Sequence, residues 1–298
     1  MAATKKKEAV ELLQTPIPVE RHDLSSGRWY SATDTYWDKH FPDTPKIYKR
    51  SSTTVENAID KGIGFNKWLG NSPTYDAAME YANYRATIGT MVHDYCERVL
   101  RGIEVDFLKE PKWLNQETGE LITVTREVQK YMMSFTQFCE DISQNGNFIT
   151  EALEICMYDL ATDNEGNQLH SWAGTADWVV KIVNKKGVEE RWMIDFKTGN
   201  AYNTHQLQLT SYKILFESLF PDHQLDGLAC LYLKSGWRKK PTTGKGYTFK
   251  KYKPDIETWN KVVAVSEWAN NYPVPSFPQE LPTTFSLKEA QVQLKESA

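Results

Sequence analysis

Two carboxylates and a lysine lie close together in the middle of the chain. Gly-Thr-Ala-Asp ends at Asp177, and Ile-Asp-Phe-Lys-Thr-Gly places Asp195 and Lys197 two positions apart. Carboxylate oxygens suit the hard cations Mg²⁺ and Mn²⁺. A lysine beside such an ion can position a water or offset charge that develops in a transition state. These residue types favour metal-dependent hydrolysis of a phosphodiester, which is a nuclease reaction.

The surrounding elements should bring these side chains together. Residues 191–197 are typical of a short strand, on which side chains two apart share a face, so Asp195 and Lys197 should point the same way. Asp177 lies in another apolar run, and Asn-Lys-Lys-Gly at 184–187 predicts a turn between two antiparallel strands. Asp-x-Lys alone is far more often part of a solvated strand face than of a catalytic site. The order of Gly-x-x-Asp, Asp-x-Lys-Thr-Gly and Gln-x-x-x-Tyr favours a site.

That order resembles the PD-(D/E)XK nuclease superfamily and, within it, the RecB-type exonuclease branch that includes CRISPR-adaptation and phage exonucleases. The resemblance covers roughly residues 50 to 235 and includes Gly89 and His93 in a Gly-x-x-x-His setting. It implies that Gln208 and Tyr212, one helical turn apart, form an auxiliary pair near the scissile phosphate. It further implies that Lys197 is the catalytic lysine and that the metal is held by His93, Asp177, Asp195 and the backbone carbonyl of Phe196.

His93 can also be placed by helical periodicity. Between residues 73 and 102, apolar residues recur every three or four positions and predict a helix with one buried stripe. The stripe consists of Tyr81, Tyr84, Ile88, Met91, Val92, Tyr95 and Val99. His93 lies off this stripe, on a track with the small residues Ala82, Ala86 and Gly89. A histidine on a polar face is commonly only solvated, but a small-residue track favours a face turned toward a cleft.

The composition is that of a globular protein. The chain has 298 residues, 40% of them hydrophobic and 12% aromatic, which suffices for one large domain or two small ones. We find neither a long apolar run nor an apolar amino-terminal segment, so we expect no membrane partner and a cytoplasmic location, bacterial or in a phage-infected cell. Four widely spaced cysteines predict reduced thiols. Because nothing after Cys230 could supply the cysteine trio of iron–sulfur relatives, we expect no such cluster.

A basic, aromatic segment follows the predicted site. The net charge is −4, but residues 234–253 contain eight basic residues and no acidic one. Basic residues neutralise phosphates and aromatic rings stack on unpaired bases, so this expected hairpin favours DNA binding. A lysine-rich edge hairpin could also serve only to discourage aggregation. The predicted DNA-binding residues are Lys234, Trp237, Arg238, Lys239, Lys240, Lys245, Lys250 and Lys251.

The pattern of elements predicts an α/β fold. We expect helices near 73–102, 123–145, 204–220 and 255–271, and strands near 148–159, 172–183, 188–197 and 228–233. The resemblance implies that these form a restriction-endonuclease-like αβββαβ core, with a mixed central sheet flanked by helices and an N-terminal helical region. We predict an irregular arm over 1–45, the nuclease domain over 46–272, and a proline-rich segment and polar tail over 273–298.

Three functions are compatible with these features. The first is a stand-alone, Mg²⁺- or Mn²⁺-dependent DNA exonuclease used in recombination, repair or phage and mobile-element DNA processing. The second is a nuclease-fold DNA-binding or assembly subunit that cleaves slowly or not at all, and the third is a nonspecific or structure-specific endonuclease. The substrate would be single-stranded DNA or a duplex with ends. Because the chain lacks a phosphate-binding loop, a helicase would be a separate partner, as would a recombinase or single-strand-binding protein.

Overall fold

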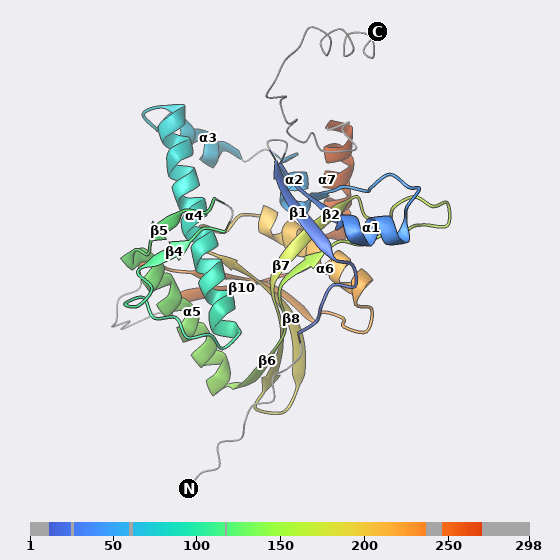
Figure 1. Cartoon of the computed structure of the whole chain (residues 1–298). Helices are drawn as coiled ribbons and strands as arrows, with labels where there is room; N and C mark the ends of the chain where they lie inside the picture. Colours follow the sequence, from blue (N-terminus) through green and yellow to red (C-terminus); the bar gives the residue numbers. More distant parts are fainter. Residues whose placement is uncertain (1–11, 25–26, 60–61, 117, 237–245, 270–298) are drawn as a thin grey trace.

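The computed structural model describes residues 12–24, 27–59, 62–116, 118–236 and 246–269 (Figure 1). Eight strands of this part form one mixed sheet in the order β1-β2-β3-β7-β8-β9-β10, with β6 also paired to β7. The strands are β1 (Val19–Leu24), β2 (Gly27–Ala32), β3 (Lys49–Ser51), β6 (Gly146–Met157), β7 (Trp172–Asn184), β8 (Glu189–Lys197), β9 (Gly227–Leu233) and β10 (Tyr247–Tyr252). The predicted α/β class with a mixed central sheet is confirmed.

Helices lie on both sides of the sheet (Figure 1). One hydrophobic cluster joins the sheet to α4 (Tyr75–Leu100) and α5 (Arg126–Gln144). A second cluster joins it to α2 (Ser52–Glu56), α6 (Thr204–Leu219) and α7 (Ile256–Ala269). The remaining elements are α1 (Asp34–His40), α3 (Gly62–Gly70) and a hairpin of β4 (Lys112–Leu114) and β5 (Leu121–Thr123). No helix in the described ranges has the length and apolar character that crossing a membrane requires.

The order of elements around the predicted site agrees with the sequence pattern. Helix α5 is followed by β6, β7, β8, α6 and β9, each within a few residues of its predicted bounds. Strands β7 and β8 pair antiparallel, whereas β8 and β9 pair parallel. Ile194 and Phe196 belong to the cluster under α4 and α5, and Met193 belongs to the cluster on the other side. The predicted alternation along β8 is therefore confirmed.

Two expectations about the amino-terminal half are wrong. Part of the segment expected to be an irregular arm forms the β1–β2 hairpin and α1, and β2 joins the sheet through β3. These strands are only six residues long, too short for a clear alternating signal, although Trp29 and Tyr30 on β2 are buried.

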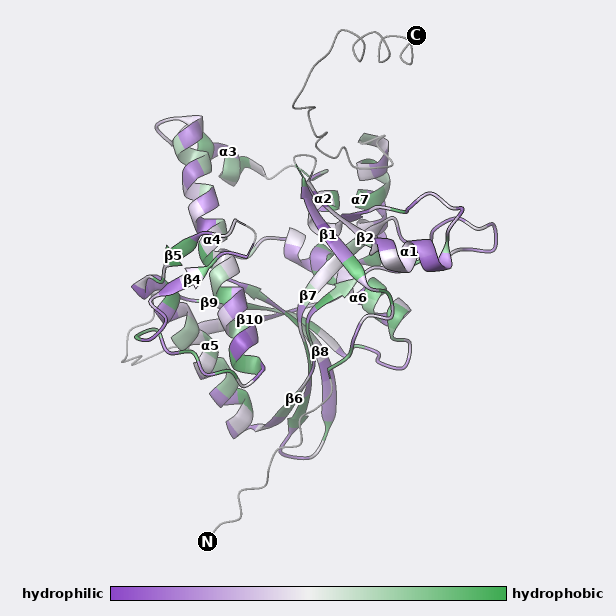
Figure 2. Cartoon of the chain, in the orientation of Figure 1, coloured by the Kyte–Doolittle hydropathy of each residue, from purple (hydrophilic) through white to green (hydrophobic). Residues whose placement is uncertain are grey.

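The apolar stripe of α4 is also only partly buried. Tyr81 and Tyr84 are 55% and 47% exposed, because the first turns of α4 extend with α3 beyond the sheet (Figure 1). Figure 2 shows the usual contrast on α5, which carries hydrophobic residues on one side and hydrophilic residues on the other.

Candidate metal centre

Asp177 is fixed between β7 and β8. The register of the two strands pairs Trp178 with Ile194, and just beyond this pair the backbone N–H of Phe196 donates a hydrogen bond to Asp177 Oδ2 at 2.6 Å. Asp177 and Asp195 are only 8% and 3% exposed. The strand pairing that the turn at 184–187 predicted therefore carries Asp177 to the end of β8, where the Asp-x-Lys motif lies.

His93 reaches this carboxylate from α4. Its Nδ1 lies 3.4 Å from Asp177 Oδ2, and its ring packs edge-on against Phe196 at a centroid distance of 5.8 Å. One turn earlier, a Cβ on Gly89 would lie 3.5 Å from Thr198 Oγ1, so this side of α4 touches the segment that follows β8. The helix face bearing His93 therefore turns toward the site, as the small-residue track predicted.

Glu154 completes the group and was missed by the sequence analysis. One ligand atom from each of His93, Glu154 and Asp177 lies within 4.8 Å of the others. Glu154 lies between the β6–β7 pairs Leu153–Trp178 and Ile155–Ala176 and so opposes Asp177. It has φ 45°, in the left-handed region that non-glycine residues rarely occupy. The only signal in the sequence is an acid inside an apolar strand.

The three side chains shift one another's pKa. Burial would lower the pKa of His93, but the charge of Asp177, a hydrogen bond to Asp177 and the charges of Glu154 and Asp195 together raise it to about 9. Burial, reinforced by Asp177, raises the pKa of Glu154 to about 8. Burial would raise the pKa of Asp177, but the charges of His93 and Lys197 and the hydrogen bonds from His93 and the Phe196 N–H together lower it. At neutral pH the group therefore holds a proton on His93, whose positive charge offsets that of Asp177, and a proton on Glu154, which leaves that carboxyl neutral.

Lys197, the last residue of β8, begins a chain of hydrogen bonds that leads to α6. Its Nζ lies 2.6 Å from Asp195 Oδ2 and donates to Gln208 Oε1 at 2.9 Å. Gln208 Nε2 in turn donates to the Tyr212 hydroxyl at 3.0 Å. Burial would lower the pKa of Lys197, but the carboxylates of Asp195 and Asp177 outweigh it and hold the pKa above its usual value. The lysine is therefore charged and held from two sides.

The glycine of the Gly-x-x-Asp motif has a steric role. A Cβ on Gly174 would lie 2.4 Å from Cε1 of Tyr212, a separation that real Cβ atoms do not adopt. Only glycine at this position lets the buried ring of Tyr212 pack against β7, where its hydroxyl accepts the hydrogen bond from Gln208. The three motifs that the sequence places in order are therefore in direct contact.

Asp195 lies beside this group, and its expected role as a ligand alongside His93 stays a prediction. Within the described residues it is not part of the group formed by His93, Glu154 and Asp177. Its Oδ2 is instead paired with Lys197, and it also accepts a weak hydrogen bond from the Cys230 thiol at 3.8 Å. The role predicted for the Phe196 carbonyl stays a prediction.

Glu56 on α2 is a second residue that sequence patterns did not reveal. Burial raises its pKa to about 8, and the charges of Lys197 and Asp195 also act on it. Its Oε1 is shielded from solvent and has no hydrogen-bond partner among the described residues. The site therefore includes a further carboxyl group that is largely protonated at neutral pH.

The predicted DNA-binding segment is described only in part. Strands β9 and β10 form the expected hairpin, whereas Trp237, Arg238, Lys239, Lys240 and Lys245 lie outside the described residues. Lys234, Lys250 and Lys251 are exposed. Lys250 lies over the Tyr252 ring at 4.8 Å, but Lys251 lies over the Trp192 ring at 4.3 Å. These two lysines do not form one patch, because consecutive strand residues point to opposite faces.

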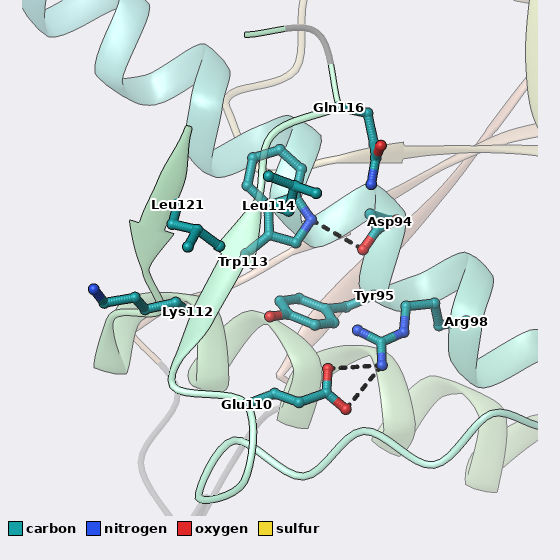
Figure 3. Close-up of a pocket in the computed structure, with 9 residues that line it drawn as sticks. All are labelled: Asp94, Tyr95, Arg98, Glu110, Lys112, Trp113, Leu114, Gln116 and Leu121. Carbon is teal, nitrogen blue, oxygen red and sulfur yellow. Dashed lines mark hydrogen bonds and ion pairs between the residues drawn. The ribbon is translucent and has the colours of Figure 1, made fainter. Parts of the chain in front are cut away.

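A separate pocket lies between α4 and the β4–β5 hairpin (Figure 3). Its lining side chains are largely paired with one another: Arg98 with Glu110 at 2.8 Å, and Trp113 Nε1 with Asp94 Oδ2 at 3.0 Å. The pocket is lined by Asp94, Tyr95, Arg98, Glu110, Lys112, Trp113, Leu114, Gln116 and Leu121. None of the predicted catalytic or metal-binding residues lines it.

Comparison with known proteins adds no assignment. No protein-family model matches this chain, and no curated protein matches its sequence. The resemblance to the RecB-type nucleases therefore rests on the motifs themselves, and the geometry described above is what bears on function.

Proposed function

We propose that this chain is a metal-dependent DNA exonuclease with the restriction-endonuclease-like αβββαβ fold of the PD-(D/E)XK superfamily. The observation that carries the proposal is the meeting of two groups at the end of β8. His93, Glu154 and Asp177 converge on one side, and Asp195 pairs with Lys197 on the other. One backbone hydrogen bond, from Phe196 to Asp177, ties the two groups together.

The residues present fit Mg²⁺ or Mn²⁺. Two carboxylates and one imidazole are donors that a hard or borderline divalent cation accepts, and their mutual distances within 4.8 Å allow one ion to contact all three. Without an ion, the protons on His93 and Glu154 reduce the negative charge of the group. A bound divalent cation would take over this role. When bound, the ion would supply Lewis acidity that lowers the pKa of a coordinated water.

The chain's own residues would prepare the remaining part of the reaction. Asp195 and Gln208 hold the Lys197 ammonium in one position, where it can stabilise negative charge on a phosphate oxygen. Tyr212 fixes the side-chain amide of Gln208. Such preorganised charge acts strongly here because the surrounding side chains are buried and exclude water.

The choice of exonuclease over the alternatives rests on the resemblance to the RecB-type branch. The same resemblance supports a role in recombination, repair or phage and mobile-element DNA processing, beside a separate recombinase, single-strand-binding protein or helicase. A nonspecific endonuclease and a weakly active DNA-binding subunit would use the same residues. The substrate experiment must therefore separate all three.

The test uses end-labelled linear DNA and circular single-stranded DNA, each incubated with Mg²⁺, Mn²⁺ or EDTA. An exonuclease degrades the linear DNA only when metal is present and spares the circle. Cleavage of the circle would assign an endonuclease instead. The matched control is Asp177→Asn, which keeps the side-chain shape but removes the charge, and its activity should be lost. Activity that persists in Asp177→Asn or in EDTA would reject the metal centre.

A further inference from the structure

A cluster of aromatic side chains extends from Lys197 toward the exposed edge of the sheet. Tyr232 is the β9 neighbour of Lys197, and its hydroxyl lies 2.7 Å from His205 Nδ1 and 2.7 Å from the Tyr252 hydroxyl. Tyr202 packs edge-on against His205 at a centroid distance of 5.6 Å. We call these residues, together with Lys250, the tyrosine–histidine edge.

Tyr202 is the most exposed ring of this edge. It lies five residues after Lys197, in the segment that joins β8 to α6, and is 58% exposed. Its contact with His205 holds it, and the hydrogen bond between His205 and Tyr232 fixes the histidine in turn. The result is an aromatic surface that is open to solvent yet anchored to the strand next to the candidate catalytic lysine.

Lys250 gives this edge a positive charge. Cys230 on β9 pairs with Asp195 on one side and with Lys250 on the other, so Lys250 lies on the sheet face that carries Asp195. His205 adds no charge of its own, because burial and the nearby Lys197 and Lys250 lower its pKa to about 3. None of the five side chains is acidic. The edge therefore combines exposed aromatic surface with positive charge.

We propose that the tyrosine–histidine edge binds an unpaired nucleotide beside the scissile phosphate, with the base stacked on Tyr202 and the phosphate contacted by Lys250. Stacking of this kind is available to unpaired bases of any sequence, whereas a base in a duplex already has both faces covered. The inference rests on the proposed nuclease function and narrows its substrate to DNA that is single-stranded at the site.

The test measures DNA binding apart from cleavage. Fluorescein-labelled oligo(dT) and a duplex of the same length are titrated in EDTA, and anisotropy reports the affinity. Tyr202→Ala should weaken oligo(dT) binding by roughly 5- to 100-fold, the range for one lost stacking contact, and Tyr202→Phe should restore it. Lys250→Ala should reduce the log–log salt slope by about 0.7. The matched controls are Tyr75→Ala, on a tyrosine 64% exposed at the start of α4, and Lys186→Ala, in the turn at the far end of β8.

The controls should bind as the wild type does. The inference is overturned if Tyr202→Ala binds oligo(dT) with wild-type affinity, or if it loses as much affinity for the duplex as for oligo(dT). It is also overturned if Lys186→Ala lowers the salt slope as much as Lys250→Ala does. Cleavage of end-labelled DNA by the wild type, measured separately with Mn²⁺, tests the proposed function. If the wild type cleaves DNA but Tyr202→Ala binds oligo(dT) as the wild type does, only the nucleotide-binding role of the tyrosine–histidine edge is rejected. If the variants show the expected binding pattern but the wild type does not cleave, only the proposed nuclease function is rejected.

Discussion

Replacing Glu154 by glycine and, separately, by alanine would test two properties of this position at once. Both substitutions remove the carboxylate that lies with His93 and Asp177, but only glycine adopts φ 45° without steric cost. If Glu154 is a ligand, both variants should lose metal affinity equally. If the backbone is strained there, the metal-free variants should differ in stability, and glycine should be the more stable one.

The magnitude follows from the backbone conformation. A left-handed residue with a Cβ costs about 1–2 kcal/mol, and glycine gives back up to about 1 kcal/mol through the greater freedom of its unfolded chain. The free energy of unfolding of Glu154→Gly should therefore exceed that of Glu154→Ala by about 1 kcal/mol. The lost carboxylate cancels in this comparison, since it is absent from both variants.

Urea unfolding in EDTA at pH 7 measures the stability difference, and calorimetric titration with Mn²⁺ measures the affinity. Loss of a direct ligand should lower the affinity by at least the 10- to 100-fold that is typical when a supporting residue is lost. Glu154→Gln serves as the control, because it keeps a side chain with a Cβ at this backbone position but lacks a carboxyl group that can ionise and bind the metal. Equal stabilities of the glycine and alanine variants would refute the strain, and wild-type Mn²⁺ affinity in both would refute the ligand assignment.

Three further predictions concern the titratable side chains of the site and of the tyrosine–histidine edge. Lys197→Ala should leave Mn²⁺ binding measurable by calorimetry but cut turnover by on the order of 10², and Lys197→Arg should rescue it poorly because its planar group differs in shape; unchanged turnover would make the lysine structural. Mn²⁺ affinity should rise between pH 6 and 9, because the ion must displace protons from His93 and Glu154, whose pKa values are about 9 and 8; calorimetry that detects no proton release would contradict this. The pKa of His205 is lowered to about 3, so its contribution to stability is present above pH 6.5 and is lost as the pH falls toward 3. Urea midpoints should accordingly fall less for His205→Gln than for the wild type over that window, and parallel curves would exclude the effect.

Much of the sheet and of the lysine side of the site could be predicted from the sequence. Alternation along residues 191–197 decides which side chains of β8 share a face, and a short turn decides that β7 pairs with β8. Asp195 and Lys197 are two residues apart on one strand, so the pattern alone places them on the same face. The apolar residues between and before them show which face is buried, because a register error of one residue would reverse both faces. Gly174 could be recognised as part of a motif, but its steric reason requires the position of the Tyr212 ring.

Glu154 could not be predicted because its position depends on an irregular strand. The β6–β7 register shifts between Thr150 and Ala152, and Glu154 then takes a left-handed conformation. Hydrophobic periodicity assumes a regular pleat, so it carries no information about either feature. The exposed Tyr81 and Tyr84 have a related cause, since periodicity shows which face of α4 is apolar but not how far the covering sheet extends.

The candidate site contains two kinds of positive charge with different roles. The charge on His93 is a proton held with a pKa of about 9, close enough to neutrality for a divalent cation to displace it together with the proton on Glu154. The charge on Lys197 is held well above its usual range by Asp195 and Asp177, so no such exchange occurs there. A cation that enters beside Asp177 would therefore displace the two exchangeable protons, while Asp195 and Gln208 still hold the lysine in place. Because the Phe196 backbone bonds to Asp177, and Phe196 lies between Asp195 and Lys197 in sequence, the carboxylate beside the exchangeable protons and the permanently charged lysine are fixed on the adjacent strands β7 and β8.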